Sequence, residues 1–361
     1  MVLFNAVKNR IIDANIGNGV VALNIGSPGG SMIKKTLAIS EWNAYLEDKI
    51  SRGYTEIQSK TGEKKKYSNP VLEMLAQKSR QIVNEAYKMS VMPTKEQISS
   101  AKEVLDELSM ITDLSSFNET LLKLFGLIPR KMKNPILYTA KNRDDYKDIL
   151  EREDSLLNNL ESISDPESDD EHISFEDCSK EETQMIYRML DKATASKFVR
   201  AYRVSNKERD DAFKQYIKDT GIKATTLLFH GSKTENWYSI IKTGLKCNPI
   251  NVVITGKMFG NGIYFAPKAD KANGYTSLSG SRWAKGHDDK AYLGIFEVGT
   301  GKEFKTDKWI SSYSAINERS FKSDYPDYNS FHALAGTALK NDEVIVYNNA
   351  ASRIRYLIEV S

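Results

Sequence analysis

The chain has 361 residues, of which 40% are hydrophobic and 27% are charged, and its formal net charge is +3. This length predicts two or three domains with apolar cores, and the small net charge excludes a strong overall field, so any nucleic-acid contact must come from a local patch. Two cysteines, Cys178 and Cys247, exclude a disulfide framework and a cysteine-based zinc site. We therefore expect no metal and a reducing compartment.

The N-terminus carries Lys8 and Arg10 among its apolar residues, unlike the uninterrupted apolar core of a signal peptide. No run approaches the roughly 20 apolar residues that a membrane helix needs. We expect an intracellular protein with no membrane partner, located in the cytoplasm, or in the nucleus if the source is eukaryotic.

Residues 1–66 are expected to form a small β-containing module. Glycines separate short β-like runs such as 20–23. A helix is expected over 40–51, ended by Gly53. The residues expected on one side of this helix are Trp42, Tyr45, Leu46 and Ile50.

Residues 67–165 are expected to be all-helical. Thr94 and Gln97 form a predicted capping box, and Ser116 and Glu119 repeat the pattern before a second apolar run. A last helix is expected over 143–163. The acidic segment that follows, 165–182, is typical of a solvated and mobile linker, and Ser179 with Glu182 caps the next helix.

From about Thr225 to the end, short apolar runs alternate with loops rich in Gly, Ser, Asn and Asp, which predicts strands. Each of three strands carries one notable polar residue: His230, Tyr264 or Glu343. Taken singly, each has a plain structural explanation as a surface or core residue. We expect the other histidines, His172, His287 and His332, at the surface. The predicted strands are 225–230, 262–266, 291–298, 343–347 and 353–360.

Four motifs occur together in order over this region. They are His-Gly-Ser at 230–232, Lys-Met-Phe-Gly-Asn-Gly-Ile-Tyr-Phe-Ala at 257–266, Tyr-Leu-Gly-Ile-Phe-Glu-Val-Gly at 292–299 and Glu-Val-Ile-Val-Tyr at 343–347. The order and the residues of these motifs, within 173–360, resemble the catalytic domain of the poly(ADP-ribose) polymerases, whose His-Tyr-Glu triad binds NAD. The resemblance implies a mixed two-sheet ADP-ribosyltransferase fold with NAD as the substrate.

On the adenosine side, the resemblance implies that His230 binds the ribose and that Ser232 and Asn236 face the adenosine. Gly231 would hold the nicotinamide carboxamide through its backbone. Ala266, which closes the tyrosine motif, belongs to the same NAD-binding set.

On the nicotinamide side, Tyr264 and Tyr275 would sandwich the ring. Glu343 would bind the ribose and activate the acceptor, because a carboxylate there can stabilise a transition state of oxocarbenium character. Lys271 matches a lysine near the acceptor site. His230, Tyr264 and Glu343 are therefore the expected catalytic residues.

Two positions depart from the family pattern. Ala272 stands where the family usually has a serine that hydrogen-bonds the carboxamide, and a lost donor of this kind costs about 1 kcal/mol of binding. Asp270 or Asn273 could compensate. Lys257 replaces a common donor-loop tyrosine.

The segments before the catalytic region also resemble parts of that family. Residues 91–108 and 124–129 resemble its helical regulatory domain, which shields the NAD site. Residues 23–57 resemble the latter half of a WGR module, although Asn24-Ile25-Gly26 replaces the namesake triplet. The module could bind DNA, or it could be a packing remnant. The candidate DNA contacts are Lys34, Lys35, Lys49, Arg52 and Lys64 to Lys66.

We therefore predict an α+β chain with a truncated WGR-like module at 1–66, an all-helical regulatory domain at 67–165 and an ADP-ribosyltransferase catalytic domain at 166–361. The predicted activity is NAD-dependent transfer of ADP-ribose to protein acceptors, including the chain itself, with polymer formation and activation by DNA strand breaks. Two alternatives stay open: a mono-ADP-ribosyltransferase regulated by a protein partner, and a non-catalytic module that binds NAD or ADP-ribose.

Overall fold

The fold is mixed α+β, as expected, and comprises two compact units, Met1–Lys65 with Arg80–Glu167 and Lys66–Ser79 with Ser168–Ser361. The three predicted domains and their boundaries stay predictions. The computed structural model describes residues 1–5, 8, 10–17, 19–26, 31–57, 67–87, 92–128, 130–132, 134–164, 172–247, 258–281, 284–336 and 338–361.

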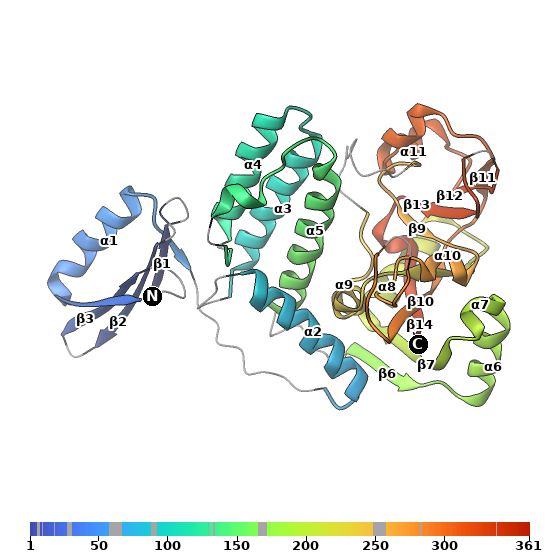
Figure 1. Ribbon diagram of the computed structural model, residues 1–361, viewed down its shortest axis with the longest axis horizontal. Coiled ribbons are helices and arrows are strands. Elements are labelled where there is room, and N and C mark those ends of the chain that lie inside the picture. The colour runs from blue at the N-terminus through green and yellow to red at the C-terminus, as the bar shows by residue number, and fades with distance from the viewer. Residues whose placement is uncertain are drawn as a thin grey trace. The chain divides into compact units, whose positions relative to one another are not determined.

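The first unit begins with an antiparallel sheet in the order β4-β3-β2-β1-β5, beside helix α1 (Figure 1). Alternate residues of the strands, such as Leu3 and Val21, pack with Trp42 of the helix in one apolar core. The elements are β1 (Val2–Asn5), β2 (Arg10–Gly17), β3 (Val20–Gly26), β4 (Met32–Ala38), η1 (Ile39–Glu41), α1 (Trp42–Ser51) and β5 (Thr55–Ile57).

The sequence located helix α1 nearly correctly. It begins at Trp42 because residues 39–41 form a short 3₁₀ turn, and Gly53 beyond its end has a φ of +80°, which fits glycine. Tyr45 and Leu46 pack against the core, as expected. Ile50 does not, because it is 55% exposed, so the predicted apolar face is one residue too long.

The same unit contains a group of longer helices, of which α3, α4 and α5 lie side by side (Figure 1). The Thr94 and Gln97 capping box at the start of α3 is confirmed. The elements are α3 (Lys95–Met110), α4 (Leu114–Leu127), η2 (Pro135–Tyr138) and α5 (Asp145–Ser164). The helix before them, α2 (Pro70–Ala86), is divided between the two units at Ser79 and Arg80.

The box predicted at Ser116 and Glu119 is wrong. The N-cap of helix α4 lies three residues earlier, at Asp113, which accepts a hydrogen bond of 2.8 Å from the backbone N–H of Ser116. Asp is as good an N-cap as Ser, so the sequence pattern did not show whether the helix begins after Asp113 or after Ser116.

Asp106 makes the first unit sensitive to pH. Burial, and then the nearby carboxylate of Asp154, raise the pKa of Asp106 from 3.8 to about 6. The folded state therefore binds the proton more tightly than the unfolded chain. The resulting stability is fully present below the unfolded pKa and is lost as the pH rises through about 6.

Asp106→Asn is expected to remove this loss, because the amide does not ionise. Thermal unfolding of both proteins between about pH 4 and pH 7 checks it. The midpoint of the wild-type protein should fall relative to that of the variant as the pH rises, and parallel curves would contradict the prediction.

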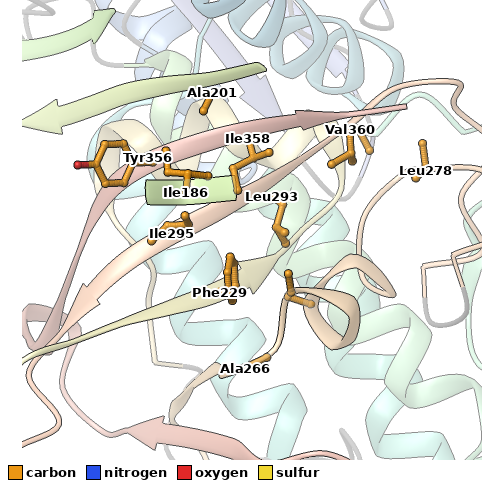
Figure 2. Close-up of a cluster of buried hydrophobic side chains, with 13 residues drawn as sticks. Ile186, Ala201, Phe229, Ala266, Leu278, Leu293, Ile295, Tyr356, Ile358 and Val360 are labelled. Carbon is orange, nitrogen blue, oxygen red and sulfur yellow. The ribbon is translucent and has the colours of Figure 1, made fainter. Parts of the chain in front are cut away.

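The second unit holds a sheet in the order β6-β7-β14-β10-β8, in which every strand pair is antiparallel. Figure 2 shows its core, in which Phe229, Leu293 and Ile358 of three adjacent strands pack with Ile186 of α6. The elements of this sheet and its helices are β6 (Ile173–Asp177), α6 (Lys180–Met189), α7 (Lys192–Ala195), β7 (Phe198–Asn206), α8 (Lys207–Thr220), β8 (Thr226–Gly231), η4 (Thr234–Asn236), α9 (Trp237–Thr243), β10 (Ala291–Val298), η6 (Asn349–Ala351) and β14 (Ser352–Val360).

A smaller sheet in the order β11-β12-β13-β9 completes the second unit. Its β11 and β12 are parallel and its other pairs are antiparallel. Backbone hydrogen bonds between Phe229 and Ala266, of 2.9 and 2.8 Å, join it to the larger sheet. The elements are β9 (Ile263–Phe265), α10 (Ala269–Asn273), β11 (Glu303–Thr306), η5 (Ser311–Ala315), α11 (Glu318–Asp324), β12 (Ser330–Ala333) and β13 (Glu343–Val346).

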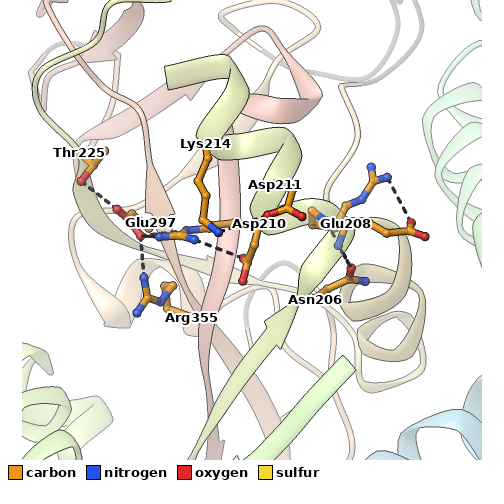
Figure 3. A network of polar contacts seen from close by, with 10 residues as sticks. Asn206, Glu208, Asp210, Asp211, Lys214, Thr225, Glu297 and Arg355 are labelled. Atoms are coloured by element: carbon orange, nitrogen blue, oxygen red, sulfur yellow. Dashed lines mark hydrogen bonds and ion pairs between the residues drawn. The ribbon is translucent and has the colours of Figure 1, made fainter. Parts of the chain in front are cut away.

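A charge network secures the larger sheet away from the joint with the smaller one. Figure 3 shows Glu297 of β10 between Thr225 and Arg355, and Arg353 adds two hydrogen bonds of 3.0 and 2.7 Å to the same carboxylate. Burial alone raises the pKa of Glu297, but the two arginines outweigh it and the pKa stays below its usual value. The network therefore ties β10 to β14 and to Thr225, the residue just before β8.

All five predicted strands are present, with ends shifted by at most one residue. Within the described residues of the second unit, four strands were missed: β6, β7, β11 and β12. One of them, Ile173–Asp177, lies inside the predicted acidic linker, where it forms the edge of the larger sheet. The capping box of Ser179 and Glu182 is confirmed.

Candidate functional site

The joint between the two sheets brings His230 and Tyr264 into contact. His230 lies near the end of β8, and its Nδ1 is 2.9 Å from the backbone oxygen of Tyr264 on β9. The rings of Trp237, Phe265 and Phe296 surround the imidazole edge-on, with centroids 5.9 to 6.5 Å away. The imidazole is therefore held by these three rings and by its contact with the Tyr264 backbone.

The Tyr264 hydroxyl is engaged in holding the loop before its own strand. It donates to the oxygen of Gly260 at 2.8 Å and accepts from the N–H of Phe259 at 3.1 Å. Burial raises the pKa of Tyr264 well above its usual value, and the carboxylate of Glu343 raises it further. The phenol therefore stays neutral, and its two hydrogen bonds fix the orientation of the ring.

Glu343 begins β13, on the face of the smaller sheet that carries Tyr264. Tyr264 pairs with Ile345, two residues along from Glu343, so the two side chains are diagonal neighbours on that face. Oε1 of Glu343 lies 2.6 Å from Nζ of Lys271, and these side chains are 14% and 12% exposed. Lys271 also donates to the backbone oxygens of Asn341 and Asp342, at 3.0 and 3.5 Å.

Gly231 lies where no side chain fits. A Cβ atom there would be 1.8 Å from the backbone oxygen of Ala272 and 3.2 Å from Cβ of Tyr275. The resemblance assigns the backbone of this glycine to the nicotinamide carboxamide, but close approach to helix α10 already requires a glycine here. This packing brings the predicted residues Gly231 and Tyr275 together, and the Tyr275 side chain is 42% exposed.

The other predicted residues flank this centre. Nδ2 of Asn236 donates to Oγ of Ser232 at 3.1 Å, across the 3₁₀ turn that leads into α9. Ala266 is buried at the joint between the sheets. The structure thus gathers His230, Gly231, Tyr264, Ala266, Lys271, Tyr275 and Glu343 around the joint, with Ser232 and Asn236 on the segment that leaves β8.

The two residues suggested to compensate for Ala272 have other partners. Asp270 accepts from the backbone N–H and the hydroxyl of Thr194, at 2.9 and 2.5 Å. Asn273 accepts from the hydroxyl of Thr276 through its backbone oxygen, at 2.8 Å, and through its side chain, at 3.3 Å. Ala272 itself is buried. Lys257 lies outside the described residues.

His332 is a residue that sequence reasoning misjudged. It was expected at the surface, but its side chain is only 13% exposed and lies between Glu303 and Asp342. It belongs to β12, one of the missed strands, so its register was not available. The adjacent pair Asp342-Glu343 was the one hint in the sequence that this end of β13 is unusual.

The remaining predictions concern metal ligands, membrane helices and DNA contacts. Within the part of the chain that the structure describes, no cluster of His, Cys, Asp and Glu side chains could hold a metal ion, and no helix has the length and apolar character that crossing a bilayer requires. Lys49 and Arg52 both pair with Asp48, at 2.8 and 2.7 Å, whereas Lys34 and Lys35 lie exposed on β4. Residues 64–66 lie outside the described residues.

Comparison with known proteins agrees with what the geometry of the site indicates. The family model of the poly(ADP-ribose) polymerase catalytic domain matches residues 180–361, which is half of the chain. A protein of Invertebrate iridescent virus 6 named "Putative poly [ADP-ribose] polymerase-like 100L" is 32% identical over 189 residues, which cover 50% of this chain and 97% of the viral one.

Longer relatives are similar over a smaller share of their length. Poly [ADP-ribose] polymerase 1 of Danio rerio is 25% identical over 313 residues, 74% of this chain and 30% of that protein. Poly [ADP-ribose] polymerase 2 of Homo sapiens is 49% identical over 53 residues, 15% of this chain and 9% of that protein. The chain therefore spans less than a third of the length of these two enzymes.

The family match covers β8, β9, β10 and β13, the strands that carry the candidate site. The chain belongs to the poly(ADP-ribose) polymerase family, and its C-terminal half is the catalytic domain of an NAD+ ADP-ribosyltransferase.

Proposed function

We propose that the chain transfers ADP-ribose from NAD to carboxylate or hydroxyl groups of proteins, including its own, and extends the product into a polymer. The observation that carries this proposal is the convergence of His230, Tyr264 and Glu343 at the joint between the sheets, with Glu343 paired to Lys271 at 2.6 Å. Family membership supplies the reaction class, and this convergence supports the roles of the individual residues.

The NAD substrate is held through few polar groups. His230 binds the adenosine ribose, and Ser232 and Asn236, already hydrogen-bonded to each other, face the adenosine. The Gly231 backbone binds the nicotinamide carboxamide. Tyr264 and Tyr275 stack on the nicotinamide ring, a role that suits the oriented Tyr264 ring and the exposed Tyr275 ring.

Bond breaking and bond making involve Glu343. The bond between the ribose carbon and the nicotinamide nitrogen breaks, and its electron pair leaves with nicotinamide. The carboxylate binds the ribose hydroxyl and stabilises the positive charge that develops on the sugar. The acceptor oxygen then bonds to the ribose carbon, and Glu343 takes the acceptor proton. Lys271 orients the carboxylate.

Activation by DNA strand breaks is the second part of the proposal. The match to the Danio rerio enzyme covers 74% of the chain, more than the half that the catalytic domain occupies, so the similarity reaches into the residues before it. The helical residues 67–165 then restrain the catalytic domain. The module at 1–66 senses DNA through its exposed basic residues, among them Lys34 and Lys35.

The test is incubation of the purified chain with labelled NAD, with and without nicked DNA, followed by gel electrophoresis. We expect NAD consumption to rise with DNA and the labelled protein to run as a smear. Because phosphate contacts are ionic, added salt should weaken the response to DNA.

The other outcomes decide between the alternatives. One discrete shifted band indicates single transfer, an unchanged rate with every form of DNA removes activation by DNA, and no turnover under any condition leaves a non-catalytic binding module.

A further inference from the structure

The start of β13 is held from both faces of the smaller sheet. Successive residues of a strand point to opposite faces, so Glu343 points to the face of Tyr264 and Asp342 points to the other. On that other face His332 pairs with Val344 in register, which places the imidazole beside Asp342. The two neighbouring acids therefore meet different partners.

His332, on β12, connects Asp342, just before β13, to Glu303 on β11. Its Nε2 lies 3.1 Å from Oδ2 of Asp342, and its Nδ1 lies 2.9 Å from Oε2 of Glu303 on β11. The second oxygen of Asp342 accepts the backbone N–H of Ala335 at 2.7 Å, and Lys305 lies 3.0 Å from Glu303. One imidazole thus links β11, β12 and the residue before Glu343.

Both carboxylates around His332 are anionic near neutral pH. Burial raises the pKa of each, but hydrogen bonds outweigh it, from Ala335 and His332 to Asp342 and from His332 and Lys305 to Glu303, so that both pKa values lie below their usual range. A neutral imidazole has one N–H, whereas an imidazolium has two and can donate to both carboxylates. The contact is therefore strongest with a protonated ring.

We propose that His332 is a positioning residue, which clamps Asp342 and Glu303 and thereby fixes the Glu343 carboxylate from the face of the sheet opposite to the site. On the side of the site, Lys271 holds the two residues just before Glu343, through hydrogen bonds to the backbone oxygens of Asn341 and Asp342. This inference rests on the proposed function, because that function gives the positioned carboxylate its role.

The kinetic test uses His332→Gln, which keeps a polar side chain but cannot bridge both carboxylates. We expect kcat for NAD turnover to fall about tenfold or more, since small misplacements of a reacting group are costly, while KM for NAD changes little. His172→Gln, at an exposed histidine, is the matched control and should keep the wild-type kcat.

A double-variant cycle separates positioning from general damage to the fold. If His332 acts through Glu343, then His332→Gln adds no further loss of kcat to Glu343→Gln. A wild-type kcat in the single variant, or two losses that multiply in the double variant, would overturn the proposal.

Hydrogen exchange tests the clamp without turnover. Backbone amides over 341–346 should exchange faster in His332→Gln and in Asp342→Asn, while those of β10 and β14 keep their rates. Unchanged exchange over 341–346 would overturn the clamp even if the enzyme is active. An inactive wild-type protein with faster exchange in these variants would instead overturn the proposed function and leave the clamp supported.

Discussion

Glu343→Gln is expected to lower NAD turnover by about a hundredfold or more, the usual loss when one transition-state contact is removed. The amide keeps the shape of the side chain but loses the negative charge that stabilises the oxocarbenium-like sugar. It also loses the ability to take a proton from the acceptor. KM for NAD should change much less than kcat, because the lost interaction develops in the transition state.

The structure indicates that this variant folds normally. Lys271, the partner of Glu343, keeps the backbone oxygens of Asn341 and Asp342 as acceptors. Glu208→Gln is a suitable control, because Glu208 lies exposed on α8 of the same unit. Labelled-NAD assays of both variants, with thermal unfolding alongside, check the prediction. Equal turnover in Glu343→Gln and the control would remove Glu343 from the reaction.

The strands that carry the site could be predicted because their signals are local. The apolar runs at 226–231, 291–298 and 352–360 are long and bounded by polar loops, and strands form there with nearly the predicted ends. Period-2 alternation also predicts that Ile345 and Tyr347 share a face, and both pack in the core of the smaller sheet. These patterns require no knowledge of distant partners.

The missed strands depend on tertiary context instead. Ile173–Asp177 contains two acidic residues, Glu176 and Asp177, and was taken for part of a linker. In the structure Arg203 of the neighbouring strand pairs with Glu176 at 2.8 Å, which offsets the unfavourable composition. The strand Ser330–Ala333 has four residues, too few to show a period, so the buried position of His332 was hidden.

Gly231 shows that one residue can have two physical reasons. A glycine after the histidine lets the backbone approach a ligand, yet the backbone of Ala272 already occupies the place of a Cβ. Sequence alone cannot separate these causes, because both demand the same residue. Only the position of α10 relative to β8 shows that packing is sufficient.

Glu153→Leu is expected to destabilise the helices of the first unit by about 3–5 kcal/mol, because it leaves a buried charge without its partner. Glu153 of α5 is buried and pairs with the buried guanidinium of Arg130, which also lies over the rings of Tyr87 and Phe125. Among the described residues, Nε and Nη1 of Arg130 have no hydrogen-bond partner. Without the carboxylate, the guanidinium loses this ion pair and keeps its contacts with the two rings.

Arg130→Met should cost less than Glu153→Leu. Glu153 keeps a second partner, because Nε of Arg152 lies 3.0 Å from its other oxygen and is partly exposed to solvent. Replacing both residues by apolar ones should be neutral or stabilising by about 1–4 kcal/mol, since neither charge then has to be desolvated. This order of the three variants is expected when the attraction between two buried charges only partly offsets the free-energy cost of desolvating them.

Hydrogen exchange along α5 is the appropriate measurement, because the four tryptophans, at 42, 237, 283 and 309, lie outside the helices at 67–165 and report on other regions. Protection of α5 should fall most in Glu153→Leu, less in Arg130→Met, and return in the double variant. Equal protection in all three would show that the pair contributes nothing. If residues 67–165 restrain the catalytic domain, basal NAD turnover without DNA should rise in the same order as protection falls. If NAD turnover does not follow this order, the stability of these helices does not control the enzyme.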